Sequence, residues 1–332
     1  MRRGAPPSDI ALTEQNFEEY CQAFKGAETI WPALPLPLDR RESWWEQWMD
    51  QTPVEQRWLK LHDHLPQLWI QPGRDTRRSE RYRRLVLQGK PPNPADRDCA
   101  PSLADTNGVK MFLARQPWGA VPVLSFDNHE DFKLALRCLA FRCEDVNLPT
   151  TVHCQAISGL PHWGLIREID SKCRCQMLLL HRAPYSSIPA ELVPGQPDAA
   201  TWIAQSQQWR LAHELTHLAC LRLVGEMRIN LFDELLADAI GMLAGLGLFS
   251  AELFRQGLGL NKDATLMDNA RAKVYVSTLK PEHHRQACHA VLERAKELER
   301  LLNDGCLPRD PMPLLQCLVR QRLNQSITVS GA

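Results

Sequence analysis

Residues 201–224, TWIAQSQQWRLAHELTHLACLRLV, contain neither glycine nor proline, and Gly225 directly after them is a suitable helix end. They predict one long helix that carries the motif HELTH at residues 213–217. Residues four apart lie on one face of a helix, so His213 and His217 project side by side and can bind one metal ion. Glu214 is rotated by about a quarter turn, which favours contact with a water on the ion rather than with the ion itself.

That water explains why this spacing indicates chemistry. A zinc ion lowers the pKa of bound water to about 7, and a neighbouring carboxylate can take its proton as it attacks a carbonyl. The spacing HExxH therefore predicts a metal-dependent hydrolase with Glu214 as general base. The alternative is a helix that carries two histidines and binds no metal, and a third ligand would distinguish the metal site from it.

The next predicted helix, from about Asn230, supplies acidic residues for that role. Glu234 can return beside the histidine pair in a short hairpin of two helices and complete a three-ligand zinc site. Asp233 could replace it after a small helix rotation, but only Glu234 shares a face with Asp238. Asp238 is predicted to accept the second ring N–H of a ligating histidine, His213 in preference to His217.

HELTH followed by ELLAD resembles the gluzincin clan of zinc metallopeptidases. The resemblance implies a zincin-like fold, a zinc ion (Zn2+) held by His213, His217 and Glu234, Glu214 as base and later proton carrier, and Asp238 behind the ligands. It covers about 26 residues, and the spacing to the third ligand is slightly shorter than in the best-known members. APYSSIPA, HELTHLA and INLFDELLADAIG together also resemble an otherwise uncharacterised bacterial family, which implies no function.

The composition sets limits on partners and location. The 332 residues include 39 basic and 39 acidic side chains, so overall charge gives no case for nucleic acid or an anionic membrane as a partner. No apolar stretch reaches the roughly 18 residues of a spanning helix, and the N-terminus lacks the apolar core of a signal peptide. We expect a cytoplasmic protein whose 11 cysteines are mostly reduced.

Two proline-rich stretches, residues 31–38 and 91–101, suggest boundaries. We predict three regions: a helical, Trp-rich N-terminal region at 1–100, a small α/β layer at 101–197 and a helical metal-binding catalytic region at 198–332. In the first, two helices interrupted by Pro53 are expected to pack through tryptophans. The predicted class is α+β, with a small mixed sheet and a mainly helical C-terminal half.

Several local features of the middle region carry further expectations. Residues 121–126 predict a strand, with Asp127 as the N-cap of the helix that follows. Residues 177–181, MLLLH, fit equally well an edge strand that pairs with a substrate and an ordinary central strand. His62 and His64 are expected at the surface. The donors available to stabilise an oxyanion are Tyr185, Arg271, Tyr275, His283 and His284.

Three functions fit these patterns. The first is a zinc-dependent hydrolase that acts on a peptide or protein substrate. The second is a metal-dependent hydrolase of another amide or ester, because activated water can attack any acyl group. The third is a non-catalytic interaction protein whose metal is structural or absent and whose Trp-rich region binds a partner.

Overall fold

The structure is a computed structural model that describes residues 15–329, and these divide into two compact units. The first unit contains residues 33–182, and the second contains residues 15–32 and 183–329. Four strands and thirteen α-helices lie in the described part of the chain. The predicted α+β class, with a small mixed sheet and a mainly helical C-terminal half, is therefore confirmed.

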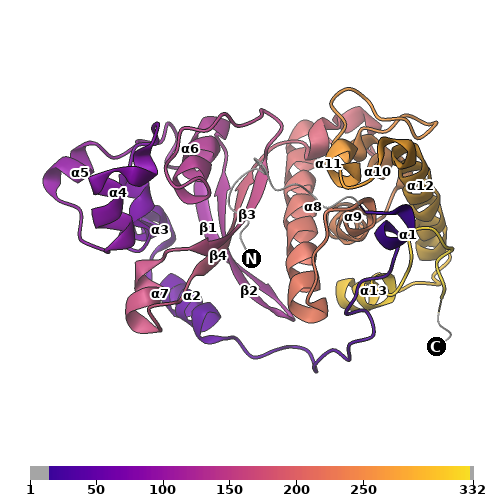
Figure 1. Ribbon diagram of the computed structural model, residues 1–332, viewed down its shortest axis with the longest axis horizontal. Helices are drawn as coiled ribbons and strands as arrows, with labels where there is room; N and C mark the ends of the chain where they lie inside the picture. Colours follow the sequence, from indigo (N-terminus) through magenta and orange to yellow (C-terminus); the bar gives the residue numbers. More distant parts are fainter. Residues whose placement is uncertain (1–14, 330–332) are drawn as a thin grey trace. The chain divides into compact units, whose positions relative to one another are not determined.

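The first unit is built around one four-stranded sheet in the order β1-β2-β4-β3 (Figure 1). A hairpin joins β1 to β2, β2 runs parallel to β4, and β3 runs antiparallel to β4. The four strands are β1 (Val109–Gln116), β2 (Gly119–Phe126), β3 (Cys154–Leu160) and β4 (Cys175–His181).

The MLLLH segment lies in β4, which is a central strand. Neighbouring strands occupy both of its backbone edges, so of the two alternatives the central strand is confirmed and the substrate-pairing edge strand is excluded. The physical reason is strand pairing, because β2 and β3 use the backbone groups on the two sides of β4, and its side chains at residues 177–180 are fully buried.

Helices of the first unit pack on one face of this sheet and close its core. Trp44 and Trp45 are buried there in edge-to-face contact at 5.2 Å, and Pro53 separates their helix from the next, as predicted. His62 is buried beside Trp58, so its expected surface position is wrong. The helices are α2 (Arg40–Gln51), α3 (Arg57–Leu61), α4 (Glu80–Tyr82), α5 (Pro94–Asp98), α6 (His129–Leu139) and α7 (Trp163–Glu168).

The N-cap of α6 is Asn128 and not Asp127. The Asn128 Oδ1 atom accepts hydrogen bonds from the backbone N–H groups of Glu130 at 2.8 Å and Asp131 at 3.1 Å. Asp127 lies one residue too early to reach them and instead pairs with Arg182 at 3.1 Å. The cap fixes where α6 starts, and therefore where His129 points.

The second unit is helical, and the helix that the sequence predicts from about Asn230 begins there. Asp198, Asn230 and Ser250 each cap a helix, and Gly225 ends the HELTH segment with φ of 76°. The helices are α1 (Phe17–Tyr20), α8 (Ala199–Ala219), α9 (Leu231–Leu246), α10 (Ala251–Leu258), α11 (Ala272–Val276), α12 (Pro281–Asn303) and α13 (Pro311–Leu318).

Two glycines of α9 allow it to lie very close to α8. A Cβ at Gly241 would lie 2.4 Å from the Cδ1 atom of Trp209, and one at Gly245 would lie 2.6 Å from the carbonyl oxygen of Gln205. A side chain at either position would push the helices apart. This close packing places the acidic residues of α9 beside the histidines of α8.

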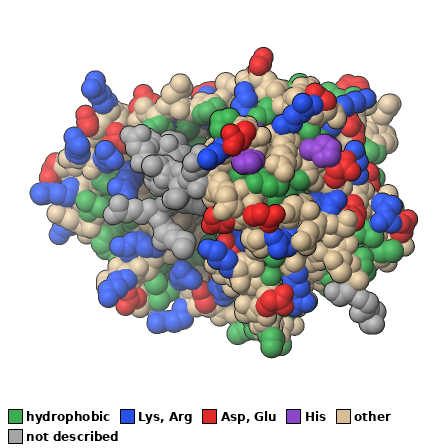
Figure 2. Space-filling model, turned by 45° about the vertical axis from the view of Figure 1, so that its right-hand side comes forward, with side chains coloured by type: hydrophobic (Ala, Val, Ile, Leu, Met, Phe, Trp, Pro, Cys, Tyr) green, Lys and Arg blue, Asp and Glu red, His purple; other side chains and the backbone are tan. Residues whose placement is uncertain are grey.

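Within residues 15–329, no single helix is long and apolar enough to cross a membrane. The helices α9 and α10 together have the length and apolar composition of a spanning segment, but they meet at a bend of 118°. On the face drawn in Figure 2, basic and acidic side chains are mixed over most of the surface.

Candidate metal centre

His213 and His217 lie one turn apart on α8, and their rings meet edge to face. The two Nε2 atoms are 3.1 Å apart, so both rings direct a nitrogen toward one point. The side chains are 5% and 12% exposed, which shows that this point lies at the buried side of the helix.

Glu234 completes a group of three donors from the start of α9. Its Oε1 atom lies 3.4 Å from His217 Nε2, and its Oε2 atom lies 3.6 Å from His213 Nε2. In a tetrahedral zinc site with bonds of 2.0–2.1 Å, neighbouring ligand atoms are separated by roughly 3.3 Å. The shortest separations are therefore close to what one zinc ion requires, although they end on different oxygens of Glu234, and one ligand atom from each residue lies within 4.8 Å of the other two. Oε2 of Glu234 has no hydrogen-bond partner in the described structure although it is buried.

Asp238 lies behind His213. Its Oδ1 atom is 2.8 Å from His213 Nδ1, and because a carboxylate only accepts, His213 carries its proton on Nδ1 and keeps a lone pair on Nε2. This is the tautomer that a metal ligand needs. The side chain of Asp238 also accepts from Trp209 Nε1 at 2.9 Å, from Arg271 Nη2 at 2.6 Å and from the Tyr185 hydroxyl.

Asp233 occupies the equivalent position behind His217. Its Oδ1 atom lies 3.3 Å from His217 Nδ1, while its Oδ2 atom accepts the backbone N–H of Arg228 at 2.8 Å. Of the two residues considered for the third donor, Glu234 therefore faces both Nε2 atoms and Asp233 faces the opposite nitrogen of one ring. Both histidines have a carboxylate at the ring nitrogen turned away from the group.

The electrostatics of the group favour a positive charge at its centre. Burial lowers the pKa of His217, but Asp233 and Glu234 outweigh it and raise that pKa well above the usual value. Burial raises the pKa of Asp238, yet Arg271 and His213 hold it well below the usual range. Burial likewise opposes ionisation of Glu234, and His213, His217 and Arg271 keep its pKa low. The carboxylates of Glu234 and Asp238 are thus ionised, and their negative charge is balanced by a proton on His217 or by a bound metal ion.

Glu214, the predicted general base, follows His213 on α8 and is partly exposed. Its carboxylate makes no hydrogen bond or ion pair with another residue in 15–329. It is therefore available for a substrate or a water.

The five predicted oxyanion donors divide into two sets. Arg271 Nη1 donates to the Tyr185 hydroxyl at 2.9 Å, and both contact Asp238, so they hold the carboxylate behind His213. Burial, with the negative charge of Glu234, raises the pKa of Tyr275 well above the usual value.

The remaining two predicted oxyanion donors, His283 and His284, make their contacts away from the metal-binding group. His283 stacks on Phe17 with ring centres 5.7 Å apart, and His284 Nε2 contacts the carbonyl of Leu279 at 3.0 Å. Neither belongs to the donor group.

Sequence reasoning missed two parts of this arrangement. Trp209 lies four residues before His213 on the same helix face, and that spacing was the available signal. The contact between Asp233 and His217 had no such signal, because it depends on how far α9 is rotated against α8.

A cavity of about 340 Å³ in the second unit lies apart from these donors and is lined mainly by residues of α10 and α12, among them Arg255 and Lys296. No curated protein and no solved structure matches the chain. A family model does match, over residues 12–176 and 170–305, which together cover most of the sequence. The chain therefore belongs to the Family of unknown function (DUF7005).

Proposed function

We propose that the protein is a zinc-dependent hydrolase of the gluzincin type, with a zincin-like second unit, and that it cleaves peptide bonds in a peptide or protein substrate. His213, His217 and Glu234 hold the zinc ion. The observation that carries the proposal is that His213, His217 and Glu234 each direct one donor atom to the same point, with these atoms within 4.8 Å of one another. The nearest contacts are 3.1 Å between the two Nε2 atoms and 3.4 and 3.6 Å from them to the two oxygens of Glu234. The hydrogen bond between Asp238 and His213 supports it, because such a partner orients an imidazole ligand, and the Asp233 carboxylate lies 3.3 Å from the outer ring nitrogen of His217.

A bound zinc ion would supply a water of lowered pKa and would polarise the substrate carbonyl. Glu214 accepts the proton of the attacking water and passes it to the leaving amine. Asp238 keeps His213 in the required tautomer, and Arg271 and Tyr185 keep Asp238 in place.

One observation favours a second candidate, a non-catalytic protein with a structural metal. The side chains of His213 and Glu234 are only 5% and 4% exposed. Structural zinc sites are closed by four protein ligands, whereas catalytic sites leave one position open. Only three donors form the group within residues 15–329, which favours the hydrolase.

The first experiment measures zinc in the purified full chain. Zinc bound at these donors falls by one equivalent in His213→Ala and in Glu234→Ala, whereas His289→Ala, an exposed histidine of α12, keeps the wild-type content. Undiminished zinc in both of the first two variants would refute the site.

The second experiment separates catalysis from binding. Glu214→Gln keeps its zinc but cleaves a peptide library at least 100-fold more slowly than wild type, as expected for loss of a general base. Glu282→Gln, on the exposed start of α12, is the matched control and keeps full activity. Equal cleavage by Glu214→Gln and wild type contradicts the mechanism. Zinc without cleavage of peptides, amides or esters favours the structural role.

A further inference from the structure

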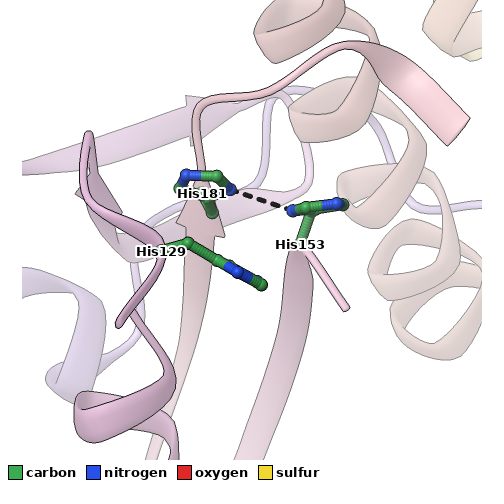
Figure 3. A group of neighbouring side chains, drawn as sticks. All are labelled: His129, His153 and His181. Carbon is green, nitrogen blue, oxygen red and sulfur yellow. Dashed lines mark hydrogen bonds between the residues drawn. The ribbon is translucent and has the colours of Figure 1, made fainter. Parts of the chain in front are cut away.

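A second group of histidines lies in the first unit, outside the site described above. His129 is the first residue of α6, His153 directly precedes β3, and His181 is the last residue of β4. Figure 3 shows the three rings gathered where β4 ends. The ring centres of the three pairs are 4.7, 5.0 and 5.1 Å apart.

The sheet and α6 bring these rings together. Cys154 pairs with Leu180 in the antiparallel register of β3 and β4, so His153 lies opposite His181, and the His181 N–H donates to the His153 carbonyl at 2.8 Å. Side chains directly opposite each other share a face of the sheet. α6 packs against β4, and its first residue adds the third ring.

The hydrogen-bond pattern around His129 leaves one nitrogen with a lone pair. His129 Nε2 lies 3.0 Å from the carbonyl oxygen of Val152. Because a carbonyl only accepts, the proton of the neutral ring lies on Nε2, and Nδ1 is left as an acceptor. A backbone carbonyl at the second nitrogen is a common way to orient a metal-ligating histidine.

The other two rings face each other through their Nδ1 atoms, which are 2.9 Å apart (Figure 3). One proton between them can satisfy this contact, or both lone pairs can bind one cation. One ligand atom from each of the three rings lies within 4.8 Å of the other two. A tetrahedral zinc site needs separations of roughly 3.3 Å, so shifts of a few tenths of an ångström at the facing pair and up to about 1.5 Å at the third ring complete it.

We propose that His129, His153 and His181 form a second zinc site. Imidazole nitrogens suit zinc and related late transition metals, while magnesium and calcium require oxygen ligands that this group lacks. Three imidazoles leave the fourth position of the ion for water or a small ligand. The bound ion links the start of α6 to the ends of two neighbouring strands.

Packing alone does not account for the arrangement. The ring centre of Phe132 lies 6.0 Å from that of His129, which stacks on it, and 6.1 Å from that of His181. Aromatic packing therefore explains why the rings of His129 and His181 lie beside Phe132. It does not explain the approach of His153 to His181 through ring nitrogens, or the tautomer of His129. A shared proton accounts for the first of these, and zinc coordination accounts for both.

The test uses the full chain with His213→Ala and His217→Ala as background, so that the other proposed site is absent. After treatment with a chelator, this protein is expected to bind one equivalent of zinc. X-ray absorption at the zinc edge should then show three imidazole nitrogens at about 2.0–2.1 Å. Adding His153→Ala or His181→Ala should remove the equivalent, whereas adding His289→Ala, in the second unit, should not.

A failure to fold is distinguished in two ways. His129→Gln retains an N–H donor for the Val152 carbonyl and should still weaken zinc binding at least 100-fold. In a chain with an intact second unit, His153→Ala should remove one equivalent and leave the other. A background protein that binds no zinc, or one that keeps its equivalent in His153→Ala and in His181→Ala, overturns the proposal. Neither result depends on peptidase activity.

Discussion

The two histidine groups of this protein are built in different ways. In the second unit, His213 and His217 come from one helical motif, and the carboxylates of α9 surround them. In the first unit, His129, His153 and His181 come from three separate segments, and a backbone carbonyl is the partner of one ring. A site carried by one helix is visible in the sequence, whereas a site assembled at the end of a sheet is not.

The groups also differ in charge. The histidines of the second unit are surrounded by three carboxylates, those of Asp233, Glu234 and Asp238. The positive charge of Arg271 offsets one of the three negative charges, so the other two neutralise a divalent cation there. The three donors of the first unit are imidazoles, so the ligands themselves bring no negative charge to a bound ion. Removing a carboxylate, or comparing zinc binding at the two groups, shows how far this difference in charge controls stability and zinc affinity.

The largest expected effect is on the stability of the second unit without metal. Asp238→Ala leaves Arg271, Trp209 and Tyr185 without their shared acceptor, and we expect α8 and α9 to lose about 3 kcal/mol of opening free energy. Hydrogen exchange of their amides in chelator measures it. In the control Asp96→Ala, which breaks a buried pair with Arg84 in the first unit, these amides are unchanged. A loss below about 1 kcal/mol contradicts the prediction.

Zinc affinity should respond next. Asp238→Asn keeps an acceptor oxygen near His213 but loses the charge, and we expect 10–100-fold weaker zinc binding at the second unit. Competition with a coloured chelator measures this. The same substitution should leave binding at His129, His153 and His181 unchanged. Equal weakening of both groups would show that the variant acts through the fold.

The intrinsic affinities of the two groups give a third test. A neutralised ion is held more firmly than one that keeps its charge in a partly buried site, so we expect zinc to bind the second unit at least about tenfold more tightly. Titration of His153→Ala and of the His213→Ala, His217→Ala double variant compares the groups singly. Tighter binding by the three imidazoles would show that charge does not set the order.

The same contrast explains what the sequence could predict. The helix start near Asn230, the helix end at Gly225 and the closeness of His213 to Glu234 follow from local spacing. The strand order does not, because it depends on which distant segments pair, and for that reason residues 177–181 fitted an edge strand and a central strand equally well. His129, His153 and His181 have no common spacing, so only the register of β3 and β4 reveals them.

A buried carboxylate away from both groups shows how charge behaves without metal donors. Burial raises the pKa of Asp96, but Arg84, the backbone of Asn93 and Arg81 outweigh this and lower it. A lowered pKa stabilises the fold above the unfolded value of about 3.9, and this contribution is lost as pH falls further. We expect Asp96→Asn to cost about 1–2 kcal/mol at pH 7 and less at pH 3, by hydrogen exchange of α4 and α5. A cost independent of pH contradicts this.

The smallest expected effects concern the two helix starts that carry a donor. Asn128 caps α6 next to His129, and Asn230 caps α9 before Glu234. Replacing either by alanine should cost about 1 kcal/mol of helix stability, which corresponds to about fivefold weaker zinc binding at the group on that helix. Asn128→Asp and Asn230→Asp keep the cap and should retain affinity. Because each cap orders only its own first turn, Asn128→Ala should not change binding in the second unit, and Asn230→Ala should not change it in the first. A cap variant that weakened both groups equally would mean that they are not separate sites.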